Sequence, residues 1–172
     1  MPADLRHQDL RDRSWADADL AGADLTGCNL AGANLARADL RGATLVDARL
    51  SGARLVGADL SDARLMGADL TRVNFRDGTA ARANFAHAAL SWGYLVGLDL
   101  RGAVLDTSDL FEAELRGADL SEVWATSVYL RRASLEGVRM RDADLRWAHL
   151  REARMPGADI RGARLESALM RS

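Results

Sequence analysis

The chain has 172 residues and a formal net charge of −2, with 23 basic and 25 acidic side chains, and every basic residue is arginine. This even mixture of charge excludes a strongly basic nucleic-acid-binding protein, and we expect no direct nucleic acid binding. The single cysteine, the absence of a leader-like start and the absence of an apolar run of bilayer length favour a cytoplasmic protein without disulfide or membrane contact.

A five-residue repeat runs through the chain without an insertion. With its apolar position taken as the centre, centres fall at every fifth residue from 5 to 170, and Leu fills 25 of these 34 positions. Ala fills 23 of the 34 positions two residues before the centre. The residue just before the centre is mostly polar, and the second residue after it is often Gly. The repeat is most regular from Ala18 to Leu70.

A period of five fits neither an α-helix nor a flat β-strand. On a helix it would spread Leu around the whole circumference, and on a strand it would send successive Leu to opposite faces. The Leu side chains share one interior only if the backbone turns a corner once per repeat, at the two residues after the centre, where Gly tolerates the required dihedral angles. Stacked coils then form an all-β solenoid filled with Leu and Ala.

The pattern A(D/N)LXX, seen for example in residues 23–27 (ADLTG), resembles the pentapeptide-repeat family over essentially the whole chain. The resemblance implies a right-handed quadrilateral β-helix with 20 residues per coil, here about eight coils in a single domain, 1–172, with no added capping helix. The residues alone do not decide the number of sides. Every twentieth residue from 19 is Asp at six of eight sites, and every fifteenth from 9 is Asp at seven of eleven.

The first coil, residues 1–15, is irregular and is expected to fray or to cap the rod. Gln8 and Arg13 occupy positions that point inward elsewhere, and polar groups there would be unfavourable in a dry core. Trp15 replaces Leu at its centre, and we expect it to cover the first apolar layer.

Between residues 71 and 99 large and small residues alternate at inward positions. Phe75, Ala80 and Phe85 are consecutive centres, and Gly78 also faces inward. Since interiors are close-packed, this pattern predicts compensation of volume within one layer. Similar compensation of side-chain volume is expected between Gly93 and Leu98 and between Val123 and Ala125.

At the other end, we expect the final layer with Leu165 and Met170 to be open to solvent. An open solenoid end exposes strand edges and apolar surface, so a homodimer could form through this bare coil end.

The sequence contains no recognisable catalytic, cofactor or metal site. His7 and His87 share the corner position but lie four coils apart, and His149 occupies another kind of position. Cys28 takes a position usually held by Ala, so we expect a buried small residue. The glycines recur with the repeat and serve corners, so they form no phosphate loop. We therefore predict that the protein is not an enzyme and has no cofactor.

Two outward features remain, of which the first is a candidate acidic face. On a four-sided coil one row of carboxylates would stack on a single face: Asp19, Asp39, Asp59, Asp99, Asp119 and Asp159. The family resemblance implies a non-catalytic, DNA-mimicking modulator that protects DNA gyrase or a related type II topoisomerase against inhibitors, and thereby a link to antibiotic resistance. The alternative for this row is a set of solvated side chains that bond to local backbone.

The second feature is a set of aromatic residues at positions that should point outward. They are Trp92, Tyr94, Phe111, Trp124, Tyr129 and Trp147. Exposed aromatic side chains gathered in one zone are typical of a contact surface. The competing function is therefore a general protein–protein interaction scaffold without DNA mimicry, in which this zone contacts a protein partner or a second copy of the chain.

Overall fold

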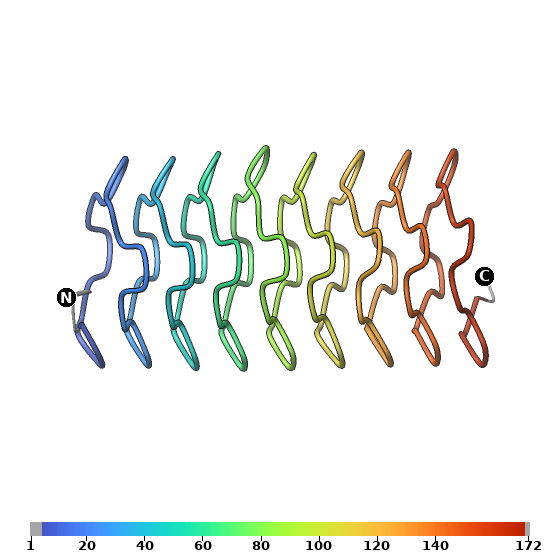
Figure 1. The fold of residues 1–172 in the computed structure, drawn as a ribbon, viewed down its shortest axis with the longest axis horizontal. Helices are drawn as coiled ribbons and strands as arrows, with labels where there is room; N and C mark the ends of the chain where they lie inside the picture. The colour runs from blue at the N-terminus through green and yellow to red at the C-terminus, as the bar shows by residue number, and fades with distance from the viewer. Residues whose placement is uncertain (1–4, 171–172) are drawn as a thin grey trace.

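The computed structural model describes residues 5–170, which form a straight rod of stacked coils (Figure 1). Within these residues no segment forms an α-helix, and no strand is longer than a single bridge. Each repeat contributes one bridge residue, just before the centre, and one two-residue turn just after it. None of the described residues forms a helix long and apolar enough to cross a bilayer.

All bridges are parallel and join residues 20 apart, such as Asp19 with Asp39 and Asn34 with Arg54. A coil therefore contains four repeats, and the rod has four sides. The alternative of three sides, which the spacing of Asp left open, is wrong because it would require pairs 15 apart. The described residues make a little over eight coils of a right-handed β-helix.

Three hydrogen bonds per repeat join neighbouring coils. In the repeat centred on Leu25, the Leu25 N–H donates to Thr44 O at 2.7 Å and the Gly27 N–H donates to Val46 O at 2.9 Å. In the other direction the Thr44 N–H donates to Ala23 O at 2.9 Å. The backbone is thus satisfied between coils, as burial requires, and it leaves only side chains on the outer walls for binding.

Every corner of residues 5–170 except the one at Gly78 is closed by a turn bond, as from Cys28 N–H to Leu25 O at 3.1 Å, and each has a positive φ at the second residue after the centre. This is the geometry of a type II turn, which favours Gly at that position. Where another residue stands there, it often pairs with the same corner one coil away. Arg37 pairs with Asp17 and Arg82 with Asp62, in both cases at 2.7 Å.

The core is the stack of Leu centres and Ala side chains, which are almost wholly buried from Leu20 to Leu150. Cys28 lies among them with no exposed surface, as expected. At the first coil Gln8 and Arg13 are exposed, whereas Trp15 is partly buried and packs against the core. Residues 1–4 of the predicted irregular coil, and 171–172, lie outside the described part of the chain.

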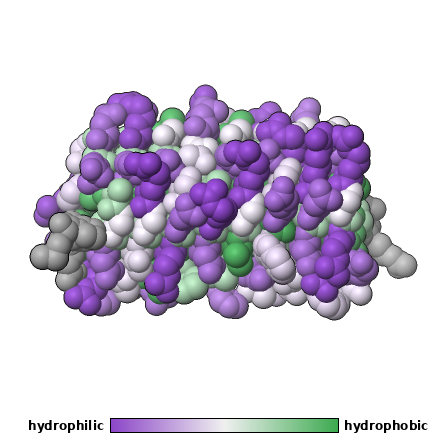
Figure 2. Space-filling model, viewed as in Figure 1, coloured by the Kyte–Doolittle hydropathy of each residue, from purple (hydrophilic) through white to green (hydrophobic). Residues whose placement is uncertain are grey.

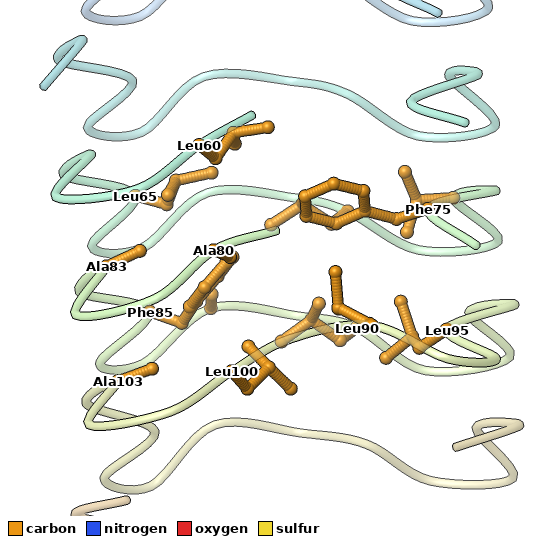
Figure 3. Close-up of a cluster of buried hydrophobic side chains, with 14 of the residues drawn as sticks. Leu60, Leu65, Phe75, Ala80, Ala83, Phe85, Leu90, Leu95, Leu100 and Ala103 are labelled. Atoms are coloured by element: carbon orange, nitrogen blue, oxygen red, sulfur yellow. The ribbon is translucent and has the colours of Figure 1, made fainter. Parts of the chain in front are cut away.

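The expected compensation of volume occurs around Phe75 and Phe85, which point toward each other from opposite sides of a coil (Figure 3). A Cβ added at Gly78 would overlap the Phe75 ring and would lie 2.8 Å from Ala58 O. The ring thus occupies the space that Ala fills in other repeats. At this turn the Gly78 N–H does not donate to Phe75 O. In every other turn of residues 5–170, the N–H three residues after a centre donates to the carbonyl oxygen of that centre.

The last coil is less covered than the rest. Leu165 is partly buried, Ile160 is 39% exposed and Met170 is 52% exposed. The expectation that the final layer, with Leu165 and Met170, is open to solvent therefore holds within residues 5–170.

Candidate functional surfaces

The six aspartates of the candidate acidic face do lie in one column. Successive bridges join Asp19 to Asp39 and Asp39 to Asp59, and a second run joins Asp99 to Asp119. Thr79 separates these two runs, and Arg139 separates Asp119 from Asp159. The column is a regular ladder because the bridge residue recurs at the same point of every coil.

Arginine side chains neutralise much of this column. Arg41 pairs with Asp39 and Arg101 with Asp99, each from the corner two residues on. Arg139, one coil further along, pairs with Asp119 at 3.0 Å. Asp159 is held by Arg141 and Arg161 together. The carboxylates of Asp19 and Asp59 accept hydrogen bonds from the backbone N–H two residues on, and Arg41 also lies 3.9 Å from Asp59. The acidic face is therefore a patchwork of ion pairs.

The same contacts keep the carboxylates ionised. The hydrogen bond from Arg101 lowers the pKa of Asp99, and the Arg41 guanidinium lowers the pKa of Asp39 in the same way. For Asp119, burial opposes ionisation, but hydrogen bonds from Ser121 and Arg139 leave its pKa below the ordinary value. Most of the column is therefore charged at neutral pH, with its charge compensated locally.

The aromatic zone, defined as Trp92, Tyr94, Phe111, Trp124, Tyr129 and Trp147, lies largely outside the core. Trp92, Trp124, Tyr129 and Trp147 are between 45% and 59% exposed. Tyr94 is 37% exposed, and Phe111 is partly buried. The prediction that these positions face outward is confirmed. Figure 2 shows the setting on one side of the rod, where hydrophilic side chains predominate and small hydrophobic patches lie between them.

Two of these aromatic rings meet at one corner, as the repeat predicts. Trp92 packs edge-to-face on Phe111 with ring centroids 5.7 Å apart. The Arg72 guanidinium lies 5.6 Å from the Trp92 ring, and the Arg131 guanidinium lies 5.8 Å from the Phe111 ring. The Trp92 Nε1–H donates to Glu112 at 3.2 Å. The corner is thus a short stack in which two aromatic rings lie between two guanidinium groups.

Tyr129 lies on the face of the rod that adjoins this corner. Its ring stacks on His149 with centroids 4.6 Å apart. A hollow of about 340 Å³ lies beside Phe111, Tyr129 and Arg131. A second hollow of about 510 Å³ shares Tyr129 and Arg131 and continues to Arg151 near the end of the rod.

Trp124 and Trp147 lie on the other side of this region and make no ring contact with each other or with Tyr129. Trp124 lines a hollow of about 490 Å³, and the Arg146 guanidinium lies 5.4 Å from the Trp147 ring. Trp92 and Trp147 both stand at corner positions with φ of 57°. A bulky side chain in this left-handed region is strained, so neither residue is there to suit the turn.

The structure adds partners that reasoning from the sequence missed. They are Arg72, Arg131, Glu112, His149 and Arg151. The signal was available, because residues 20 apart along the chain lie side by side on the rod. Adding the column neighbours of each aromatic residue would have found Arg72, Glu112 and His149, and Arg131 and Arg151 follow Phe111 in its column.

The histidines do not form a common site. His7 and His87 are exposed at corners, whereas His149 is partly buried against Tyr129. His87 Nδ1 lies 2.5 Å from the Thr107 hydroxyl oxygen. The same hydroxyl donates to the backbone carbonyl oxygen of Asp106. Both side chains are exposed, so this pair lacks the enclosed environment that activates a hydroxyl. No group of three potential metal ligands occurs within residues 5–170.

Solved structures that resemble the rod are pentapeptide repeat proteins. A trypsin-treated form of QnrB1, a plasmid-mediated fluoroquinolone resistance protein, is 18% identical over 99% of this chain and 92% of its own, with a TM-score of 0.49. HetL, which is involved in heterocyst differentiation regulation in the cyanobacterium Nostoc sp. strain PCC 7120, is 27% identical over 98% and 89%, with a TM-score of 0.29.

A comparison with curated protein sequences finds no match. The family profile described as pentapeptide repeats matches the chain in residues 3–42, 18–55, 43–79, 83–121 and 129–166, with 8 copies. Proteins of this kind are generally binding or structural proteins without catalytic activity. Because these matches cover most of the sequence, the chain belongs to the pentapeptide repeat family.

Proposed function

We propose that this protein is a non-catalytic binding rod that contacts a protein partner through its aromatic zone. The observation that supports this most is the exposure of Trp92, Trp124 and Trp147, at 49%, 59% and 51%. Tryptophan, tyrosine and arginine dominate the energetics of protein interfaces, and exposed aromatic surface on this scale is typical of a contact site.

The corner positions of Trp92 and Trp147 strengthen the proposal. Thirteen described glycines take the same positive-φ conformation, at Gly22 and Gly42 among others. A tryptophan there forfeits the conformational ease of glycine, and about half of its surface stays exposed, so its contacts within the rod use only part of the side chain. Binding is the function that would retain both side chains.

The proposal is tested with a variant that combines Trp92→Ala, Trp124→Ala and Tyr129→Ala. We expect it to lose a cross-linked or co-purified partner, or self-association by light scattering, while its circular dichroism and thermal unfolding stay close to the native protein. A matched control replaces three outward apolar residues of the first half, as Val46→Ala, Val56→Ala and Met66→Ala. Equal binding by the aromatic variant and the native protein would reject the zone as the contact site.

A second candidate is supported by the carboxylate column. In this proposal the partner is a DNA gyrase or related type II topoisomerase, and the rod modulates it or protects it against inhibitors by presenting charge as duplex DNA does. The ladder Asp19–Asp39–Asp59 and the lowered pKa of Asp99 favour it. The ion pairs to Arg41, Arg101 and Arg161 weaken it, which makes the aromatic zone the stronger proposal.

This second candidate predicts opposite effects for two sets of variants in a gyrase supercoiling assay with and without an inhibitor. Replacing Asp59, Asp99 and Asp119 by arginine should abolish any effect of the rod. Replacing Arg41, Arg101 and Arg161 by alanine should unmask carboxylates and strengthen it. No effect of the native protein over a wide concentration range, or loss of effect in both sets, would contradict DNA mimicry.

A further inference from the structure

The two hollows beside Tyr129 join into one trough on the surface of the rod. Both are lined by Tyr129 and Arg131. The hollow of about 340 Å³ extends toward the N-terminal coils, to Phe111 and Asp109. The hollow of about 510 Å³ extends toward the last coil, to His149, Arg151 and Leu169. Together they have a volume in the range of ordinary ligand sites, but they are open along one side.

The floor of the trough is the bridge column Asp109, Tyr129, His149 and Leu169, whose members are joined in sequence by bridges. At about 4.8 Å per coil this column is about 14 Å long, the length of about four extended residues. Its middle is the stacked pair Tyr129 and His149, and Leu169 at its end is 42% exposed. The floor is therefore mainly aromatic and apolar.

Phe111, Arg131 and Arg151 form one wall, since they occupy the same corner in successive coils. Among residues 5–170 the guanidinium of Arg151 has no hydrogen-bond or ion-pair partner. The acidic residue beside it, Glu152, is already engaged by Arg132 at 2.7 Å and by Arg131 at 3.5 Å. Positive charge is thus left unpaired at one end of an apolar floor.

We propose that this trough binds a short extended segment of a partner protein that carries carboxylate side chains next to apolar ones. This inference rests on the proposed protein-binding function and names the chemistry of the partner. An apolar side chain of the segment packs on Tyr129 and Phe111, and a carboxylate pairs with the guanidinium of Arg151, with Arg131 beside it. Because the rod's backbone groups are bonded between coils, recognition is by side chains alone, and Arg–carboxylate geometry gives the specificity.

A protein segment fits better than a single-stranded nucleic acid. Nucleic acid grooves repeat cations at the spacing of phosphates and carry a net positive charge. Here Asp109 lies in the floor, and Glu112 and Glu152 lie beside the wall of Arg131 and Arg151. A strand of phosphates would meet all three carboxylates, whereas one or two carboxylates of a peptide can be placed at Arg151.

The test uses three probes of equal length with the same neutral fluorophore, measured by fluorescence anisotropy against the full-length protein. They are a hexapeptide of alternating aspartate and leucine, the same peptide with asparagine for aspartate, and hexathymidylate. We expect the acidic peptide to bind at least tenfold more tightly than the asparagine peptide. We expect Arg151→Glu to weaken it at least tenfold, with thermal unfolding unchanged. The matched control is Arg154→Glu, which reverses an exposed arginine of the adjoining face and should change binding less than twofold.

Several results would overturn the proposal. These are no binding of the acidic peptide at millimolar protein, equal binding of the asparagine peptide, equal loss in Arg151→Glu and Arg154→Glu, or tighter binding of hexathymidylate. The proposed function fails separately. If the aromatic variant loses its partner while Arg151→Glu keeps it, the protein-binding function stands and the acidic partner is wrong.

Discussion

The two halves of the rod differ in where their aromatic residues point, inward in the first half and outward in the second. Before residue 92 the aromatic residues are Trp15, Phe75 and Phe85, all at centres and all packed in or against the core. From Trp92 onward the six aromatic residues all stand at bridge or corner positions on the outside. The backbone does not change between the halves, since the same 20-residue bridges and turns continue throughout.

The comparison separates what the fold requires from what it tolerates. The inward Phe75 and Phe85 are matched by small residues in the same layer, such as Gly78 and Ala80, so the core has adapted to them. The outward Trp92 and Trp147 contact only other surface side chains, such as Phe111 and Arg146, and both stand in left-handed corners. The first group is explained by packing, whereas the packing of the core does not require the outward aromatic residues of the second group.

The largest expected difference between the halves is in stability. Phe85→Ala should lower the free energy of unfolding by about 3–5 kcal/mol, because it removes a fully buried ring and leaves a cavity. Trp124→Ala should lower it by no more than about 0.5 kcal/mol, since the side chain is exposed. Urea unfolding followed by circular dichroism checks both. Similar losses in the two variants would mean that the outward aromatic residues belong to the core after all.

A smaller effect tests the adaptation of the core itself. Gly78→Ala should lower the free energy of unfolding by about 1–3 kcal/mol, because the new Cβ would overlap the Phe75 ring. Adding Phe75→Leu should recover part of this loss by freeing the space. Adding Phe85→Leu should recover none, since the three atoms nearest to the Cβ at residue 78 belong to Phe75 and Ala58. Equal recovery in both double variants would contradict local compensation.

Acid sensitivity distinguishes a buried ion pair from exposed ones. Hydrogen bonds from Arg146 lower the pKa of Asp144, which is buried, and Arg37 lowers the pKa of the exposed Asp17. A lowered folded-state pKa contributes stability above the unfolded-state pKa of about 3.9 and loses it as pH falls through the folded-state pKa.

The thermal midpoint should therefore fall as pH is lowered below about 4. Asp144→Asn should flatten this dependence and lower stability at pH 7 by about 1–2 kcal/mol. Asp17→Asn, in a solvent-screened exposed pair, should leave stability nearly unchanged. Thermal unfolding between pH 2.5 and 7 measures both. If Asp17→Asn flattens the profile as much as Asp144→Asn, burial is not the cause.

Much of the rod could be predicted from the sequence because each repeat obeys the same local rule. Successive side chains within a repeat point to opposite sides of the wall, which places Leu and Ala inside, and the corner positions place residues such as Trp92 outside. The four-sided cross-section could not be obtained this way. Every repeat turns the same kind of corner in a three-sided and in a four-sided coil, and the spacing of the Asp residues fits coils of 15 and of 20 residues.

The environment of each surface residue was the other unpredictable part. Arg41 and Arg101 follow Asp39 and Asp99 by two residues, but whether they pair with these carboxylates or extend into solvent depends on side-chain rotamers. Arg139 reaches Asp119 from the next coil, a contact that exists only once the period of 20 is known. The repeat therefore predicts the column of aspartates and the arginines beside it, whereas the individual ion pairs appear only in the structure.

The smallest predicted effect has opposite signs at two tryptophans. Trp147 holds a φ of 57°, so Trp147→Gly relieves left-handed strain and should raise the free energy of unfolding by about 0.5–1 kcal/mol, even though the contact with Arg146 is lost. Trp124 stands at a bridge position with ordinary φ. Trp124→Gly should lower the free energy of unfolding by about 0.5–1 kcal/mol, because glycine weakens a strand.

The same pair of variants also connects strain to function. If the outward tryptophans are retained for binding, Trp147→Gly yields a more stable rod with a weaker partner complex, which is the usual trade between stability and activity. Chemical denaturation and the cross-linking assay measure the two quantities on one protein preparation. A stabilised variant with undiminished binding would remove Trp147 from the contact surface. A destabilised variant would show that this corner, unlike the glycine corners of the first half, is adapted to its tryptophan.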